Sequence, residues 1–205
     1  MAILEEKTKI LEFAINKFIS GGFYKTSMDE IASQMHISKK TIYKYYSSKE
    51  ELVQEVAHEF LRKNHLAIRE KIAEGNNAVE KLFGLMKYLG GILMKISQRM
   101  LSDFQTHMPA MWKEIDEFRT KKMTSFLGEI IEQGKKEGYF INENTDLLLT
   151  VFISSIRGVV NPSFSVSNKV SMSNALETTI TILLNGILTD KGEKIFNKLK
   201  DGAGK

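Results

Sequence analysis

Residues 36–49 read HISKKTIYKYYSSK, and this stretch decides the fold. It contains four lysines and three tyrosines but no acidic residue. Ile42 and Tyr46 are four residues apart, so both would lie on one face of a helix, and we expect that face to be buried. The stretch therefore predicts a short helix with an apolar face toward a core and a basic face that carries hydroxyl groups.

Helix-start signals flank this stretch on both sides. In SMDE (27–30) and in SKEE (48–51), a serine is followed three residues later by a glutamate, which is the capping-box pattern that begins helices. Ser38 supplies a further cap between them. The chain is therefore expected to start three helices in quick succession.

The first of these helices is expected at about 28–35, and the second is expected to begin after Ser38 and to end near Tyr46. The third begins near Lys49 and continues to about Ala73. Two short helices joined by so short a turn form a helix-turn-helix.

The outward face of the second helix has the chemistry of a DNA contact. Lysine neutralises phosphate and can donate to guanine in the major groove, while threonine and tyrosine hydroxyls bond phosphate oxygens. A basic helix face is often only a solvated surface, but here it coincides with the second helix of a helix-turn-helix. The side chains expected to point outward are Lys39, Lys40, Thr41, Lys44 and Tyr45.

The amino-acid composition limits the classes of protein to which this chain can belong. The 205 residues carry a formal net charge of +4, and 42% of them are hydrophobic, which is enough for a packed core. The chain has no cysteine, which excludes disulfides and thiol catalysis and fits a reducing cytoplasm. The four histidines show no ligand spacing with carboxylates, so we expect no metal and no cofactor. We see no signal-peptide pattern and no apolar run of spanning length, and we expect a cytoplasmic protein without a membrane segment.

Apolar residues recur three and four positions apart along the chain, which predicts an all-α fold. We expect a three-helix domain over residues 1–50, with the helix from about Lys49 leading onward, and a helical domain over residues 51–205. TTITILL (178–184) is rich in β-branched residues, but its apolar positions keep helical spacing, so we interpret it as helix. Helices of the second domain are expected at 78–95, 97–108, 110–136, 145–160 and 173–188, with loops at 134–144 and 161–173 and a fraying basic tail from Lys191.

The runs ILEFAINKFISGGFYKTS (10–27) and TSMDEIASQMHISKKTIYKYYSSKEEL (26–52) resemble the N-terminal domain of the TetR family of bacterial transcriptional regulators. The resemblance covers about residues 8–55 and makes 38–46 the recognition helix. It implies a homodimeric repressor that a small ligand releases from a palindromic DNA operator. His36 stands where the family usually has glycine, so we expect a left-handed backbone at this position.

The resemblance also assigns roles residue by residue. It implies phosphate contacts from Tyr43 and Lys49, and base contacts from among Lys39, Lys40, Lys44 and Tyr45. The full set of expected DNA-binding residues is Thr26, Ser38, Lys39, Lys40, Thr41, Tyr43, Lys44, Tyr45 and Lys49.

Methionine and aromatic residues are frequent between residues 83 and 126, and such side chains adapt to irregular apolar ligands. They can equally form ordinary core packing, and both interpretations stay open. As a set they predict an apolar effector pocket between helices. The candidate ligand-binding residues are Met86, Phe104, His107, Met108, Trp112, Phe126 and Arg157. His107 would otherwise be a structural or surface histidine, and for Arg157 we favour a place in a dimer interface.

Residues 145–188 are expected to form the homodimer, because the last two long helices are the usual dimerisation elements of the family. The apolar positions expected to contribute are Leu147, Leu148, Val151, Leu176, Ile180, Leu183 and Ile187. The expected switch is a tilt of the helix from about Lys49 to Ala73, which would change the separation of two recognition helices.

Two other classes of protein compete with this interpretation. One is a helix-turn-helix DNA-binding protein without a small-molecule effector, which would lack a cavity in residues 78–188. The other is an all-α enzyme, for which the sequence offers no nucleophile motif, no paired carboxylates and no phosphate loop. We therefore expect a regulator rather than an enzyme.

Overall fold

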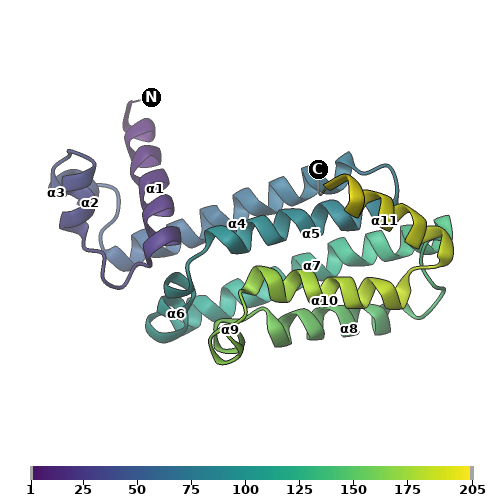
Figure 1. Cartoon of the computed structure of the whole chain (residues 1–205). Coiled ribbons are helices and arrows are strands. Elements are labelled where there is room, and N and C mark those ends of the chain that lie inside the picture. The colour runs from purple at the N-terminus through teal and green to yellow at the C-terminus, as the bar shows by residue number, and fades with distance from the viewer. Residues whose placement is uncertain (1, 204–205) are drawn as a thin grey trace. The chain divides into compact units, whose positions relative to one another are not determined.

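The computed structural model describes residues 2–203, and these form eleven α-helices and no β-strand. The all-α prediction is confirmed. The helices are α1 (Ala2–Gly21), α2 (Met28–Gln34), α3 (Lys39–Tyr43), α4 (Lys49–Glu74), α5 (Ala78–Lys95), α6 (Gln98–His107), α7 (Pro109–Glu137), α8 (Thr145–Val159), α9 (Pro162–Asn168), α10 (Met172–Ile187) and α11 (Asp190–Ala203) (Figure 1).

The chain packs as two compact units. The first unit comprises the residues up to Asn64 together with Lys95–Asp116, and the second comprises His65–Met94 together with the residues from Glu117 onward. Helices α4, α5 and α7 contribute residues to both units. The domain boundary expected at residue 50 separates a DNA-binding part from an effector-binding part, and it does not describe how the chain packs. This boundary stays a prediction.

One hydrophobic cluster holds the first unit together. Ile10, Ala14 and Phe18 repeat every four residues along α1, and all three are fully buried. Ile31 of α2 and Leu52 of α4 belong to the same cluster and are equally buried. Burying one such side chain is worth about 1.5–3 kcal/mol, so the cluster fixes the three N-terminal helices around the start of α4.

A second cluster fills the second unit, in which α8 and α10 lie side by side (Figure 1). Phe196 of α11 packs edge-on against Phe83 of α5, with ring centroids 6.1 Å apart. The backbone N–H of Ile141 donates to the Ile187 carbonyl at 2.8 Å, next to an isolated antiparallel bridge between Phe140 and Leu188. These contacts tie the segment before α8 to the end of α10.

Two expectations about the C-terminal region are wrong. The Ser/Asn-rich segment 161–173 is not a loop, because it contains α9 and the first residues of α10. Asn161 caps α9 by accepting from the Phe164 N–H at 2.8 Å. The tail from Lys191 forms α11 instead of fraying, because Phe196 on its inner face is 2% exposed and anchors it to the core.

Among the described residues, no single helix has both the length and the apolar composition to cross a membrane, although α8 and α9 taken together, with a 59° bend, meet that test.

Candidate DNA-binding surface

The turn between α2 and α3 is built on a left-handed residue. His36 has φ 56°, as expected from its position in the turn. Its N–H donates to the Ser33 carbonyl at 3.2 Å, and the N–H of Ile37 donates to the Ala32 carbonyl at 3.0 Å. This pair of bonds is the Schellman arrangement, which satisfies the last carbonyls of a helix and turns the chain sharply.

Ser38 begins α3 and its side chain accepts from the Thr41 N–H at 3.0 Å. The buried face predicted for residues 38–46 is confirmed, because the side chains of Ile42 and Tyr46 are both 0% exposed. The Tyr46 hydroxyl donates to the Lys7 carbonyl of α1 at 3.3 Å, and burial raises the pKa of Tyr46 to about 12. α3 ends at Tyr43 rather than near Tyr46, with Lys44 as its C-cap.

The outward face of α3 exposes Lys39, Lys40, Tyr43 and Lys44. The Lys39 ammonium lies 2.8 Å from an Asp29 carboxylate oxygen and 5.9 Å from the centre of the Tyr43 ring. Within the part of the chain that the structure describes, no carboxylate lies within ion-pair distance of Lys40 or Lys44. These two ammonium groups can therefore meet a phosphate without first breaking an ion pair. Thr41 is half-buried beside them.

Two residues expected to face DNA are held inward. Thr26 is 7% exposed, and its hydroxyl donates to the Gly22 carbonyl at 3.1 Å. Tyr45 is half-buried and its hydroxyl donates to a Glu6 carboxylate oxygen of α1 at 2.6 Å. These hydroxyl groups hold the turn and α1 in place, and the Tyr45 hydroxyl also accepts from the Lys44 ammonium at 3.3 Å. The DNA contacts expected from Thr26 and Tyr45 stay predictions.

Lys49, the first residue of α4, occupies a partly buried position. Its ammonium donates to the Tyr24 carbonyl at 2.8 Å. Burial lowers the pKa of Lys49, while the charges of Glu50 and Asp103 act in the opposite direction. A lysine ammonium has three donors, so a phosphate could share this group with the Tyr24 carbonyl.

An acidic residue that sequence reasoning missed fixes the loop before α2. The Asp103 carboxylate of α6 accepts from the backbone N–H groups of Phe23 at 2.7 Å and Tyr24 at 2.8 Å. Gly22 has φ 80°, and a Cβ there would lie 2.6 Å from the same carboxylate. The signal was present, because Asp103 falls in the buried stripe of α6 with Met100.

His107 contacts this loop through its ring, and a ligand contact from His107 stays a prediction. Its ring stacks on the Tyr24 ring, with centroids 3.6 Å apart and planes within 3°. The Ser97 N–H, just before α6, donates to the Ile19 carbonyl of α1 at 2.8 Å. α6 therefore holds α1 and the following loop at several points.

The other candidate ligand residues are divided between the two units. Phe104 is buried in the core of the first unit, and Met108 and Trp112 pack against that core. Met86 and Phe126 belong to the core of the second unit, and Arg157 lies on an exposed position of α8. An effector pocket formed by these residues stays a prediction.

His65 of α4 is a polar side chain among aromatic rings of the second unit, and sequence reasoning did not select it. Its ring stacks on Phe126 with centroids 5.3 Å apart and lies edge-on to Phe118 at 6.3 Å. The Nδ1 atom is buried and has no hydrogen-bond partner among the described residues. Burial lowers the pKa of His65, and the nearby charges of Lys122 and Arg69 lower it further.

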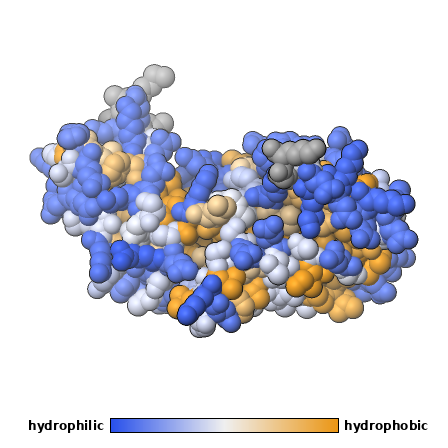
Figure 2. All heavy atoms as spheres, viewed as in Figure 1, coloured by the Kyte–Doolittle hydropathy of each residue, from blue (hydrophilic) through white to orange (hydrophobic). Residues whose placement is uncertain are grey.

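α8 and α10 expose large apolar side chains. Leu147 and Val151 of α8 are 58% and 43% exposed, and Ile182 of α10 is 66% exposed. Figure 2 shows hydrophobic (orange) atoms gathered along the edge where α8 lies. Four positions expected in the dimer interface are instead buried in the core of the unit, namely Leu148, Leu176, Ile180 and Ile187.

Comparison with known proteins agrees with this geometry. A sequence model described as "Bacterial regulatory proteins, tetR family" matches residues 10–56. The chain is 25% identical over 169 residues to YvaF of Bacillus subtilis, an uncharacterized HTH-type transcriptional regulator, covering 82% of this chain and 88% of the relative. It is 23% identical over 191 residues to the HTH-type transcriptional repressor KstR2 of Mycolicibacterium smegmatis, covering 92% and 93% of the two chains. A transcriptional regulator from Cytophaga hutchinsonii has the same fold, with a TM-score of 0.70 at 22% identity over 89% of this chain and 98% of that one.

Proposed function

Because this chain is a DNA-binding transcriptional regulator of the TetR family, we propose that it is a cytoplasmic homodimeric repressor that a small ligand releases from a palindromic operator. Its relatives and its fold are those of transcriptional regulators, which are not enzymes. The observation that carries the proposal is the exposed face of α3, where Lys40 and Lys44 stand without acidic partners among the described residues.

On DNA, α3 lies in the major groove, and Lys40 and Lys44 face phosphates and base edges. The Lys39 ammonium exchanges Asp29 for a phosphate, so its net contribution is smaller than that of Lys40. Tyr43 donates its exposed hydroxyl to a backbone phosphate, which fixes position without reading sequence. Lys49 shares its ammonium between the Tyr24 carbonyl and a phosphate.

Dimerisation supplies the second recognition helix. A single α3 of five residues reads too little DNA to specify a site, and two copies about 34–36 Å apart read a palindrome. The exposed Leu147, Val151 and Ile182 support a self-complementary interface through α8 and α10. An apolar surface of this kind, unusual on a monomer, is buried when two copies pair.

An effector acts by population shift, with α4 as the moving element. A ligand that favours a state with mis-spaced recognition helices withdraws the protein from DNA. A complete reversal from 99:1 to 1:99 needs a preference of about 5.5 kcal/mol. The aromatic rings around His65 suit a mostly apolar effector with one hydrogen-bonding group, which would engage the buried Nδ1 atom.

A DNA-binding protein without an effector is the second candidate. The packing of three candidate ligand residues favours this alternative. Phe104, Met108 and Trp112 pack in or against the core around the helix-turn-helix and are thereby used for the fold. Operator binding titrated with an apolar ligand that demonstrably changes Trp112 fluorescence separates the two. Loss of operator affinity at saturation supports the effector-responsive repressor, and unchanged affinity supports the alternative.

The DNA-binding proposal is tested by the salt dependence of binding. Replacing Lys39, Lys40 and Lys44 together by alanine should lower the slope of log affinity against log salt by about two to three, since each phosphate contact contributes about 0.9. The matched control replaces Lys194, Lys198 and Lys200 of α11 by alanine, which removes the same charge from another surface. Equal loss for both triple variants would contradict a contact through α3.

A further inference from the structure

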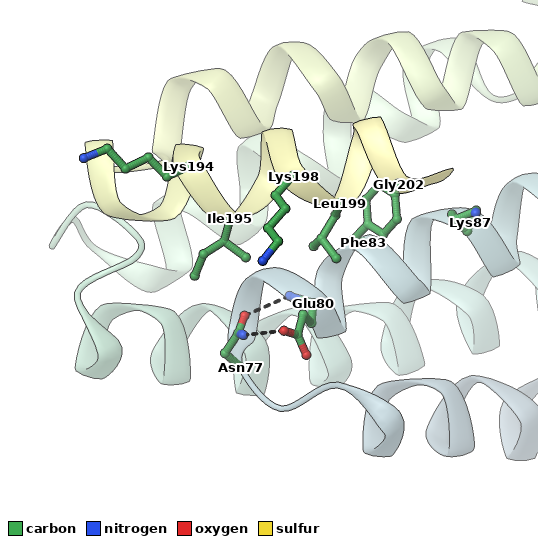
Figure 3. Close-up of a pocket in the computed structure, with 9 residues that line it drawn as sticks. All are labelled: Asn77, Glu80, Phe83, Lys87, Lys194, Ile195, Lys198, Leu199 and Gly202. Atoms are coloured by element: carbon green, nitrogen blue, oxygen red, sulfur yellow. Dashed lines mark hydrogen bonds between the residues drawn. The ribbon is translucent and has the colours of Figure 1, made fainter. Parts of the chain in front are cut away.

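A groove of about 700 Å³ lies between α5 and α11 of the second unit (Figure 3). None of the residues that line it is among the candidate ligand residues considered above. Its size falls within the range of small-molecule sites in proteins. The residues of α11 that line it run from Lys194 to Gly202, which corresponds to about 12 Å of helix at 1.5 Å per residue.

The floor of the groove is apolar. Ile195 and Leu199 of α11 and Phe83 of α5 line it, and all three are half-buried. In Figure 3 their side chains point into the space between the two helices. Partly exposed aliphatic and aromatic side chains in a concave surface favour a hydrocarbon ligand, because a ligand removes their remaining surface from water.

The rim of the groove is basic. Lys87, Lys194 and Lys198 line it, and Figure 3 shows the Lys198 ammonium directed toward α5. Within the described part of the chain, neither Lys194 nor Lys198 has a carboxylate within ion-pair distance. The Lys87 ammonium lies 5.7 Å from the centre of the Phe83 ring.

The one acidic residue of the groove is already engaged at the start of α5. The Glu80 carboxylate accepts from the Asn76 N–H at 2.8 Å and from the Asn77 side-chain amide at 2.9 Å. These hydrogen bonds, led by that from the Asn76 backbone, lower the pKa of Glu80. Its charge is therefore satisfied by the residues just before α5, and the Lys198 ammonium is directed toward the same groove above the apolar floor (Figure 3).

We propose that this groove binds a medium-chain fatty carboxylate. The carboxylate pairs with the Lys198 ammonium, and the hydrocarbon covers Phe83, Ile195 and Leu199. The opposite charge at the rim and the apolar floor together select an anionic amphipath over a neutral one. The groove is separate from the predicted effector pocket, so this proposal can be tested independently of the proposed function.

The test is a titration of the whole protein with hexanoate, octanoate and decanoate, followed by amide chemical shifts in NMR spectra. The amides of Phe83, Ile195 and Leu199 should shift together. The affinity derived from them should rise between about two- and fourfold per added methylene, the upper value corresponding to full burial. The Phe126 amide reports separately on binding in the core of the second unit.

Charge-reversal variants make the test specific. Lys198→Glu should weaken decanoate binding at these amides at least tenfold and leave decanol binding unchanged. Lys200→Glu is the matched control, since it makes the same change on the same helix at a residue that does not line the groove. Lys198→Gln, which only removes the charge, should give an intermediate loss.

Several results would overturn the proposal. Equal weakening by the two glutamate variants would indicate general electrostatic attraction. Decanoate shifts confined to Phe126, or an affinity independent of chain length, would place the ligand elsewhere. Shifts in the groove with an acidic amphipathic peptide but not with decanoate would make it a protein-docking surface. Shifts that depend on protein concentration alone would make it a contact between copies of this chain.

Discussion

The carboxylate of Asp103 accepts a 2.7 Å hydrogen bond from the backbone N–H of Phe23, although the two residues are 80 positions apart in the chain. The same carboxylate accepts a hydrogen bond from the backbone N–H of Tyr24, and the Tyr24 carbonyl accepts one from the Lys49 ammonium. The loop that leads into the helix-turn-helix is thus fixed by α6 and by the first residue of α4. Its geometry is a tertiary property and depends on these partners.

Replacing Asp103 by alanine should destabilise the fold by about 2–4 kcal/mol, because two N–H groups lose a charged acceptor in a buried position. Asp103→Asn keeps one acceptor oxygen and should cost less. Chemical denaturation of both variants measures the change. An unfolding midpoint for Asp103→Ala equal to that of the wild type would show that this link contributes nothing.

His36→Gly should be neutral or stabilising by up to about 1 kcal/mol, because glycine adopts the left-handed backbone of the turn without steric cost. His36→Val is the contrasting variant, since a β-branched residue is most strained at positive φ. It should lower the free energy of unfolding by about 1–2 kcal/mol. If valine and glycine gave the same stability, the left-handed turn would not exist in solution.

Lys44→Ala and Lys49→Ala should weaken DNA binding in different ways. Because Lys49 is proposed to contact a phosphate, its removal should weaken binding about equally for specific and random DNA and lower the salt slope by about one. Lys44 is exposed on α3, and its removal should relax preference at one base position by about 1–3 kcal/mol. A change in sequence preference caused by Lys49→Ala, without a change in slope, would reverse the two assignments.

His65→Phe should reduce the pH dependence of stability below neutrality. Because the folded-state pKa of His65 lies below its unfolded value, protonation favours the unfolded chain. The contribution of His65 is therefore fully present above the unfolded pKa of about 6.5 and is lost as pH falls through the folded pKa. Urea unfolding at about pH 7.5 and about pH 5.5 should show a smaller difference for the variant. An identical difference would mean that the ring is solvated in both states.

Ile182→Glu should convert a dimer to a monomer, because it places a charge in the proposed α8–α10 interface. Val166→Glu is the matched control, since Val166 of α9 is 65% exposed and Ile182 is 66% exposed. Sedimentation at micromolar concentration measures both variants. A wild-type protein that is itself monomeric, or a monomer produced equally by Val166→Glu, would contradict the interface.

Local patterns made the helix-turn-helix predictable. The caps at Ser27 and Ser38 and the four-residue spacing of Ile42 and Tyr46 depend on neighbours within one turn of helix, and the structure confirms them. The same holds for residues 178–184, where helical spacing prevails over the β-branched composition and places the segment within α10.

Features that depend on distant partners were not predictable. The hydrogen bond from the Tyr45 hydroxyl to the Glu6 carboxylate is one example, because the two residues are 39 positions apart in the chain. The spacing of apolar residues in the sequence identifies the buried face of a helix. It does not identify the other helix that packs against that face. For this reason the sequence suggests one pocket for Phe104 and Phe126, whereas the structure places them in separate cores.

Selection of bound duplexes from a random DNA pool tests whether the protein reads DNA as a dimer through α3, because the operator sequence need not be known beforehand. A palindrome whose half-sites lie one helical turn apart, about 34–36 Å, should be enriched. The Lys44→Ala variant should enrich the same palindrome with one symmetric pair of positions relaxed. Enrichment of no sequence, or of a single unpaired site that Lys44→Ala leaves unchanged, would contradict a dimeric regulator that reads DNA through α3.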